Sequence, residues 1–545
     1  MRKLVLLILT GYAQAFSVPA VAVSPPLPTP EAPQDFLTGT EEKPFDWYKQ
    51  WYPIAVPEYL DPGRPQHVQL LGKDLVIWKD KSETWNAFED KCPHRLVPLS
   101  EGRVEDDGTL LCAYHAWRFD GSGACVDIPQ SSAKAKEQHQ QMERACATKY
   151  PTMEAQELLW VWPVSGPLAF EQSKLRHPLL IPELEDKELM ASGRVVAAAI
   201  GIRDLPYGYD TFLDNVLDPA HVAVAHHGIM GSRYTDAKPV TFEKGRKATT
   251  QDGFSMFSIT EDKNGKLSKG LQDFSPPCRL LLGSAVENND EMRSVLALYA
   301  VPTKPGWCRN IGRQILIKDS EGNLPPGLGI YAKPLPKWLL HVTASLFLHQ
   351  DMVFLHHQQG ILDAQGIDNS NYSSSIFSPN GQDTSVLRFR RWLANRGGGG
   401  VDWVPTISRA LPPREYDESK LFDVYHTHTK NCRYCKDALK NTQRGLKVLK
   451  AASLAAVAAG AYRRQVVPFA LLAGICYGGH IVLEKLEAMF YTYPFHHQVC
   501  LVFDVIAYLL LSSVNYSNHA LAALSWRIDR IDRPLFMTYN PNPNS

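Results

Sequence analysis

Two short segments of the chain each place one cysteine and one histidine close together. They are Cys92-Pro-His94 and Cys112-Ala-Tyr-His115, and seventeen residues separate them. A [2Fe–2S] cluster with two thiolates on one iron and two imidazoles on the other needs this composition. Tetrahedral zinc also accepts two cysteines and two histidines, but zinc fingers usually run Cys-Cys and then His-His, whereas here the order alternates. The spacing therefore predicts a Rieske-type cluster held by Cys92, His94, Cys112 and His115.

A second group of ligand-type residues lies in the helix-like segment 203–228. Asp218 and His221 are three residues apart and share a helical face, and Asp218-Pro219 is typical of an N-cap followed by proline. His221 and His226 are five residues apart, about 140° around an ideal helix, so both reach one metal only at the edge of a face or across a local distortion. Two histidines and one carboxylate are the ligand set of non-haem Fe(II) oxygenases, and the upstream electron carrier needs such an acceptor.

The third iron ligand must come from another part of the chain. Asp351 is the first candidate, because it faces the apolar side of the helix-like segment 349–365, and Asp363 is the fallback. Three further histidines suit pocket lining or exposed positions better than iron binding, although exchange with His226 stays open: His227, His356 and His357.

The elements that must position these residues differ along the chain. Short runs that alternate apolar and polar residues, separated by Gly or Asp turns, indicate an antiparallel β unit over 45–165 around the cluster. Residues 166–425 are long enough for a second soluble domain that carries the mononuclear iron. The predicted fold class is α+β.

The two ends of the chain have the composition of targeting and membrane segments. Residues 1–15 combine a basic start, an apolar stretch and a small-x-small site, as in a signal peptide, and 16–44 resembles a transit or linker segment. Two apolar runs, 466–483 and 499–514, are near membrane-spanning length, and a shorter Ala-rich run lies at 451–462. Arg463 and Arg464 would form a tight polar turn between the runs 451–462 and 466–483. We predict transmembrane helices within 446–515 and a polar tail over 516–545; the alternative is a helical pair packed on the soluble part.

The segment 426–445 contains a Cys-x-x-Cys pair, Cys432 and Cys435. Such pairs often have a lowered thiol pKa and exchange disulfides, so a regulatory dithiol with thioredoxin as candidate partner is the first interpretation. The nearby His426 and His428 also permit a small zinc site, and an inert pair is the third alternative. Six other cysteines have no predicted role: Cys125, Cys146, Cys278, Cys308, Cys476 and Cys500.

The overall charge excludes one class of partner. The chain has 57 Lys and Arg against 57 Asp and Glu, and it carries no long basic run. Proteins that bind nucleic acid concentrate positive charge, because counterion release supplies much of their affinity. We therefore predict no nucleic-acid partner.

Several segments together resemble the Rieske non-haem iron oxygenases. Within them, the resemblance is to the plastid branch of pheophorbide a oxygenase and the translocon-associated Rieske proteins, over about residues 45–440. The segments are CPHR and CAYHAW at the cluster ligands, NVLDPAHVAVAH at 215–226, and FDWYKQWYP, RDLPYGYD, QDMVFL and FRRW at 45–53, 203–210, 350–355 and 389–392.

The resemblance implies a role for each ligand residue. The Rieske domain would be antiparallel β, followed by a helix-grip type catalytic domain in which His221, His226 and Asp351 hold Fe²⁺. In the family, the residue matching Asp218 bridges electron flow from a Rieske histidine of a neighbouring subunit in a head-to-tail trimer, which would make His115 to Asp218 an intersubunit contact. One departure is Ala116, where the family usually has glycine.

The resemblance also implies the reaction and the location. Reduced ferredoxin would supply electrons, O₂ would be the cosubstrate, and a chlorophyll-derived tetrapyrrole would gain one oxygen atom at a macrocycle bridge carbon. The expected location is a plastid membrane, envelope or thylakoid, and the leader resembles those of complex algal plastids. The alternatives are a redox-sensing membrane component of plastid protein import, and an oxygenase acting on protochlorophyllide, chlorophyllide or another plastid lipid.

Overall fold

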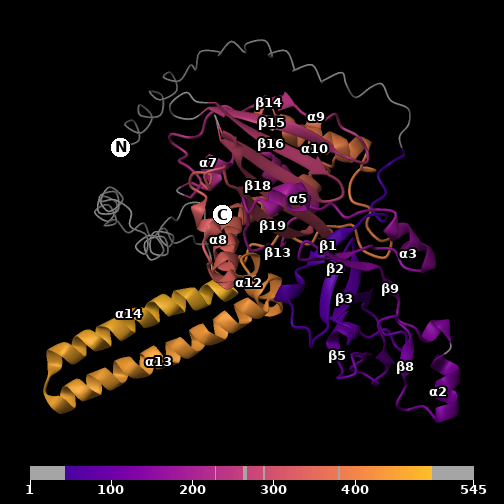
Figure 1. The fold of residues 1–545 in the computed structure, drawn as a ribbon, viewed down its shortest axis with the longest axis horizontal. Helices are drawn as coiled ribbons and strands as arrows, with labels where there is room; N and C mark the ends of the chain where they lie inside the picture. Colours follow the sequence, from indigo (N-terminus) through magenta and orange to yellow (C-terminus); the bar gives the residue numbers. More distant parts are fainter. Residues whose placement is uncertain are drawn as a thin grey trace, which may run out of the picture.

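The computed structural model describes residues 43–140, 142–227, 229–261, 267–286, 289–378 and 381–493. The predicted signal peptide, all but the last two residues of the transit segment, the apolar run 499–514 and the polar tail lie outside the described residues. Figure 1 shows a body of sheets and helices from which one long helical hairpin projects.

The predicted cluster ligands belong to two small antiparallel sheets. The first has the order β2-β3-β4-β9 and the second β5-β6-β7-β8. Their core packs Trp78 edge-on against Phe88, with ring centroids 5.6 Å apart, beside the buried Phe119. The strands are β2 (Gln66–Leu70), β3 (Lys73–Lys79), β4 (Trp85–Glu89), β9 (Lys149–Tyr150), β5 (Arg103–Val104), β6 (Leu110–Leu111), β7 (Arg118–Phe119) and β8 (Cys125–Asp127).

A large antiparallel sheet forms the centre of the body, in the order β12-β19-β18-β17-β16-β15-β14, with β13 also paired to β19. Its strands are β12 (Val195–Ala197), β13 (Gly201–Leu205), β14 (Thr241–Lys244), β15 (Phe254–Glu261), β16 (Leu267–Ser275), β17 (Arg279–Val286), β18 (Asn289–Lys304) and β19 (Trp307–Ile317). A third sheet has the order β1-β11-β10, from β1 (Tyr52–Ala55), β11 (Leu158–Val161) and β10 (Thr152–Ala155). Trp160 of β11 packs edge-on against Tyr299 of β18 at 5.4 Å, so one continuous core joins the third sheet and the sheet β2-β3-β4-β9 to the large one.

The long helix α8 (Lys337–Ala364) crosses this body and carries the segment predicted to supply the carboxylate. Its buried residues recur every three or four positions, which is the spacing of a helix packed along one face. The other helices of the body are α2 (Ala133–Gln140), α3 (Pro167–Lys174), α4 (Pro182–Glu185), α5 (Lys187–Ala191), α6 (Tyr209–Leu217), α7 (Val222–Ala225), α9 (Tyr372–Ser375), α10 (Thr384–Asn395), α11 (Glu418–Leu421) and α12 (Val424–Thr427). Short 3₁₀ turns are η2 (Pro57–Tyr59), η3 (Leu99–Glu101), η4 (Glu143–Ala145), η5 (Gly329–Ala332), η6 (Gly381–Asp383) and η7 (Thr429–Asn431).

Two buried arginines fix α6 and α8 in place. Arg390 of α10 donates to the carboxylates of Asp210 and Asp214 on α6, so two of the quoted motifs meet at one ion-pair network. Arg203 of β13 contacts His349 Nε2 on α8 at 2.7 Å. These contacts position α8, which carries Asp351, and α6, which directly precedes the segment with His221 and His226.

The projecting hairpin consists of α13 (Arg433–Arg463) and α14 (Val466–Tyr491). The polar turn expected between the apolar runs forms at Arg464, which adopts a left-handed conformation with φ +54°. Both helices are long and apolar enough to cross a membrane. Apolar side chains on them are exposed, including Leu471 at 65% and Ile475 at 72%. The pair extends away from the body instead of packing along it, and the predicted α+β class with a C-terminal helical pair is confirmed.

Candidate metal centres

The two predicted cluster loops have the same backbone design. The first loop follows β4 and the second joins β6 to β7. In each loop the cysteine N–H bonds to a carbonyl five residues on, Cys92 to Val97 and Cys112 to Trp117, both at 2.8 Å. The histidine rings His94 and His115 lie 4.6 Å apart between centroids. The two loops are therefore matched hairpins, and each one carries one cysteine sulfur and one imidazole.

The chemistry of the loops fits an iron–sulfur cluster better than one zinc ion. Cys92, together with the backbone N–H groups of Tyr114 and His115, lowers the pKa of the Cys112 thiol, while the same contact and burial raise the pKa of the Cys92 thiol, so the pair stabilises one negative charge between its two sulfurs. A single tetrahedral ion needs all its ligand atoms within about 4 Å of one another. Among the described residues, the two sets of ligand side chains gathered within 4.8 Å lie elsewhere, so these four ligands leave room for a two-iron cluster.

Each loop also contains a left-handed residue four positions after its cysteine. These residues are Leu96 with φ +58° and Ala116 with φ +57°. Glycine is favoured in this conformation because it has no Cβ. The structure thus gives a physical reason to expect glycine, as the resemblance implies, at the position of Ala116.

Replacing Ala116 by glycine should stabilise this loop. Relief of left-handed strain, less the extra entropy of the unfolded chain, predicts a gain of about 0.5 to 1 kcal/mol. The midpoint temperature of unfolding, monitored by the loss of the cluster's visible absorbance, should rise by a few degrees. Ala113→Gly is the matched control, since Ala113 has no positive φ and should lose stability. Equal shifts in the two variants would contradict the explanation.

The second centre brings together His221, His226 and Asp351. One ligand atom from each side chain lies within 4.8 Å of the other two, and His226 Nε2 is 3.2 Å from Asp351 Oδ2. His221 and His226 flank the single turn of α7, at its N-cap and C-cap positions. Because the chain is helical for only one turn between them, the two histidines are not held at the 140° separation of an ideal helix. This break is the local distortion that the sequence analysis gave as one way for both to reach one metal.

The polar atoms of this centre fit a bound cation. Asp351 Oδ1 is buried and has no hydrogen-bond partner, which is costly for a carboxylate that faces no positive charge. His226 Nδ1 lies 2.9 Å from Gln350 Oε1, so this nitrogen donates and Nε2 keeps its lone pair towards Asp351. Two imidazole nitrogens and one carboxylate on one side of a cavity suit Fe²⁺ with open coordination positions.

Asp218 does not cap a following helix. The sequence predicts an N-cap, but the residue is the C-cap of α6, and its Oδ1 accepts from the N–H of Ala220 at 2.8 Å. The turn closes through Ala220 because Pro219 has no N–H to donate. Asp218 Oδ2 lies 3.7 Å from His221 Nδ1, although the two residues cap different helices and do not share the helical face that the sequence predicts.

The remaining candidate ligands do not join the second centre. Asp363 is exposed near the C-terminal end of α8, twelve residues or about 18 Å beyond Asp351 along the axis. His356 is buried, and both its nitrogens contact backbone, at the Pro206 carbonyl and the Glu415 N–H. His227 accepts from the N–H of Arg233, and His357 stacks on Tyr416.

A cavity of about 510 Å³ opens beside the second centre. Its volume lies in the range of small-molecule sites. The lining residues are Asp218, Ala220, His221, Val224, Ala225, Arg233, Phe354 and Gln382. The cavity therefore has Asp218 and the iron-ligand candidate His221 in a wall of mixed apolar and polar side chains.

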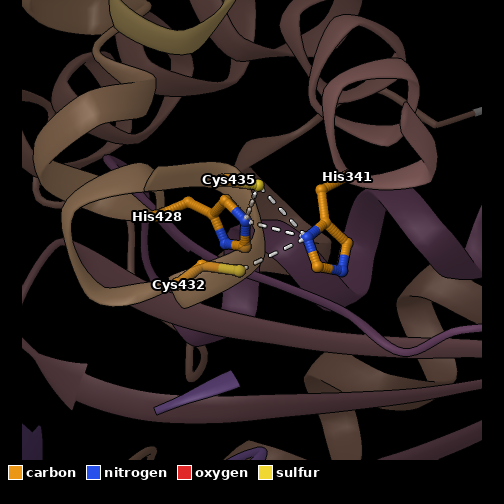
Figure 2. Close-up of side chains that lie close together, drawn as sticks. All are labelled: His341, His428, Cys432 and Cys435. Atoms are coloured by element: carbon orange, nitrogen blue, oxygen red, sulfur yellow. Dashed lines mark hydrogen bonds between the residues drawn. The ribbon is translucent and has the colours of Figure 1, made fainter. Parts of the chain in front are cut away.

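Cys432 and Cys435 lie at the start of α13, and both are buried. They face two histidines, His428 and His341 (Figure 2). His426 points elsewhere, because it is exposed and bonds to Asp423 at 2.7 Å. Sequence analysis missed His341, whose α8 position is 87 residues before His428 and gives no local spacing signal.

Comparison with known proteins assigns the family. The Rieske [2Fe-2S] domain model matches residues 50–150, and the pheophorbide a oxygenase model matches residues 274–368. Chloroplastic pheophorbide a oxygenase of Oryza sativa subsp. japonica is 35% identical over 436 residues, which are 77% of this chain and 78% of that protein. The chain belongs to the plastid Rieske oxygenases. Like that relative, it is a Rieske-type non-haem iron monooxygenase.

The names of other similar proteins refer to different small molecules, a flavonoid in one case and protochlorophyllide in another. Chloroplastic flavonoid 8-hydroxylase 2 of Ocimum basilicum is 30% identical, covering 87% of this chain and 90% of that protein. Chloroplastic protochlorophyllide-dependent translocon component 52 of Arabidopsis thaliana is 32% identical, covering 76% of each chain. Chloroplastic relatives of this kind support a plastid location.

Family membership also establishes the cofactors. The chain has a Rieske [2Fe–2S] cluster and a mononuclear non-haem iron, with O₂ as cosubstrate. Rieske oxygenases take electrons from donors such as ferredoxin and act on small molecules.

Proposed function

We propose that this protein is a ferredoxin-dependent monooxygenase that inserts one oxygen atom of O₂ into a chlorophyll-derived tetrapyrrole of the pheophorbide type. The observation that carries the proposal is the complete set of His221, His226 and Asp351 in a chain 35% identical to a pheophorbide a oxygenase. The mononuclear iron would supply O₂ activation. The chain would supply ligand orientation and a cavity beside the iron.

Three residues have separate tasks at the proposed iron. Asp351 contributes the negative charge, and its burial keeps water from competing for the site. Gln350, its neighbour on α8, fixes the tautomer of His226. Asp218 and His221 both line the cavity, where the carboxylate can orient the histidine and accept a proton.

Gln350→Leu should weaken iron binding about 10- to 100-fold, because a ligand histidine that loses its hydrogen-bond partner loses its orientation. The measurement is retention of the mononuclear iron during dialysis against a weak chelator. Gln358→Leu is the control, since Gln358 is exposed on the same helix. Equal iron retention in both variants would show that Gln350 does not support iron binding.

The arrangement of the two centres supports a trimeric enzyme. In Figure 1 the cluster unit, β5 to β8, and the helix α7 lie at opposite ends of the body. Electron transfer falls steeply with distance, so each iron is served by the cluster of a neighbouring subunit, with His115 meeting Asp218. Exposed apolar side chains on both faces suit such a contact: Leu96 and Tyr114 beside the cluster, and Val224, Met230 and Tyr234 beside the iron.

The projecting hairpin supports a membrane location for the enzyme. We assign α13 and α14 as an anchor in a plastid membrane, because their exposed apolar side chains would otherwise face water. The leader over 1–44 is assigned to plastid targeting, on its composition. An apolar pigment dissolved in or near the bilayer would reach an anchored enzyme directly.

A redox-sensing component of protein import is the second candidate, supported by the similarity to a translocon component. The intact ligand set favours the enzyme, since a sensor that uses only the cluster has no need of His221, His226 and Asp351 together.

The test of the proposed function is a substrate panel with the full-length protein. The reduced protein, with ferredoxin, receives oxygen and one candidate at a time: pheophorbide a, protochlorophyllide, chlorophyllide a or a flavone. We expect pheophorbide a to stimulate O₂ uptake most. If another compound of the panel alone stimulates O₂ uptake, that compound replaces pheophorbide a as the proposed substrate. If no compound stimulates O₂ uptake although both iron centres are loaded, the oxygenase function is rejected.

A further inference from the structure

The base of the helical hairpin contains a compact group of four ligand-type side chains. They are His341 on α8, His428 between α12 and η7, and Cys432 and Cys435 at the start of α13. Figure 2 shows the two rings and the two sulfurs pointing towards one another. All four ligand atoms lie within 4.8 Å of each other.

The separations match the edges of a zinc tetrahedron. His341 Nδ1 is 3.2 Å from His428 Nε2, 3.3 Å from Cys435 Sγ and 3.6 Å from Cys432 Sγ, and His428 Nε2 is 3.3 Å from Cys435 Sγ. Tetrahedral zinc, with bonds of about 2.05 Å to nitrogen and about 2.3 Å to sulfur, gives edges of about 3.3 Å for N–N and about 3.5 Å for N–S. The observed distances agree with these values to within about 0.2 Å.

The burial of the group is costly without a cation. The exposed fractions are 3% for His341, 5% for His428, 2% for Cys432 and 1% for Cys435. The Nδ1 atom of His341 faces three other ligand atoms but can donate only one proton. A divalent ion would satisfy all four atoms, and with two thiolates its charge would be balanced inside the protein.

We propose that His341, His428, Cys432 and Cys435 bind one structural zinc ion that ties the hairpin to the catalytic body. The ligand set is closed, with two nitrogens and two sulfurs, as in structural rather than catalytic zinc sites. This inference is independent of the proposed substrate, because no atom of the site touches the iron centre or the cavity described above.

The position of the site suggests what the zinc does. Helix α8 carries both His341 and the proposed iron ligand Asp351, whereas Cys432 and Cys435 begin the first hairpin helix. The same junction contains Tyr434, whose hydroxyl donates to Glu58 at 2.6 Å, and Lys337, which pairs with that carboxylate. Zinc would fix the angle at which the hairpin leaves the body, and so the orientation of the iron centre relative to the membrane.

A regulatory dithiol is the competing interpretation of the two cysteines. Thioredoxin attacks a sulfur directly, and both sulfurs lie in side chains that are at most 2% exposed. A dithiol also gives no reason for two buried histidines from distant segments to face the sulfurs. The geometry therefore favours a metal site over an exchangeable disulfide.

The test is a metal count on the full-length protein, purified anaerobically in detergent without chelator. We expect about one zinc per chain, in addition to iron. Zinc X-ray absorption should show two sulfurs at about 2.3 Å and two nitrogens at about 2.0 to 2.1 Å. His428→Ala and Cys435→Ala should lower zinc at least tenfold while the Rieske absorption band persists. His426→Ala, two residues away and exposed, should keep its zinc.

Three outcomes in the wild-type protein would overturn the proposal. They are wild-type protein without stoichiometric zinc, a different metal on these ligands, and Cys432 and Cys435 recovered as a disulfide or as freely reacting thiols in the native protein. If the variants fail to fold, the zinc count and the absorption spectrum of the wild-type protein decide the question. Unchanged zinc in both ligand variants would also reject the site.

Discussion

Replacing Asp351 by alanine should empty the mononuclear site and abolish turnover, while the Rieske cluster stays in place. The carboxylate is one of the three candidate iron ligands that the structure brings together among the described residues, and it is buried against His226. Two imidazoles alone hold Fe²⁺ weakly, so we expect iron to fall from about three atoms per chain to about two. Turnover should fall to below about one hundredth of the wild-type rate, more than the loss expected for an outer partner such as Gln350.

Asp363→Ala on the same helix is the matched control. Asp363 is exposed, so its removal should change neither the iron content nor the rate. The electron paramagnetic resonance signal of the reduced cluster should be the same in both variants. Full iron content in Asp351→Ala would contradict the ligand assignment, and loss of the cluster signal would show a general folding defect.

Replacing Asp218 by asparagine should leave both metals bound and slow electron transfer between them. Asparagine keeps an oxygen that can accept from the N–H of Ala220, so the turn at the end of α6 should survive. It removes the negative charge that lies 3.7 Å from His221 Nδ1. We expect the cluster of the reduced protein to be oxidised by O₂ and substrate at least about 100-fold more slowly in a single turnover, since misplacing one orienting group can cost that much.

The control for this second prediction separates the charge from the turn. Asp218→Ala removes both the charge and the turn acceptor, and should be as slow as the asparagine variant and less stable. An unchanged single-turnover rate in Asp218→Asn would remove the bridging role. Loss of iron in Asp218→Asn would instead show that Asp218 orients His221 for iron binding.

The sequence predicted the features that depend on local spacing. The cluster loops are short, so the spacing of Cys92, His94, Cys112 and His115 was sufficient to predict two matching loops, whereas the role of these residues as cluster ligands stays a prediction. The apolar runs likewise predicted the hairpin and its turn at Arg464. Asp351 followed from its chemistry and its place on an apolar helix face.

One feature that the sequence did not predict depends on contacts between distant segments. His341 joins His428 and the two cysteines only because α8 lies against the start of α13 in the folded chain. The predicted N-cap at Asp218 was wrong for a local reason: Asp218 directly precedes Pro219 and is extended, with φ −98° and ψ 102°, so it ends α6 instead of starting a helix.

A single turnover with ¹⁸O₂ tests the central claim, that two iron centres in this chain cooperate to oxygenate a tetrapyrrole. The protein is reduced anaerobically, freed of ferredoxin and mixed with ¹⁸O₂ and pheophorbide a. We predict that the Rieske cluster is oxidised only when the pigment is present, and that the product contains one ¹⁸O atom. Fully loaded protein that oxidises its cluster without labelling the pigment, or that does not react, would contradict the claim.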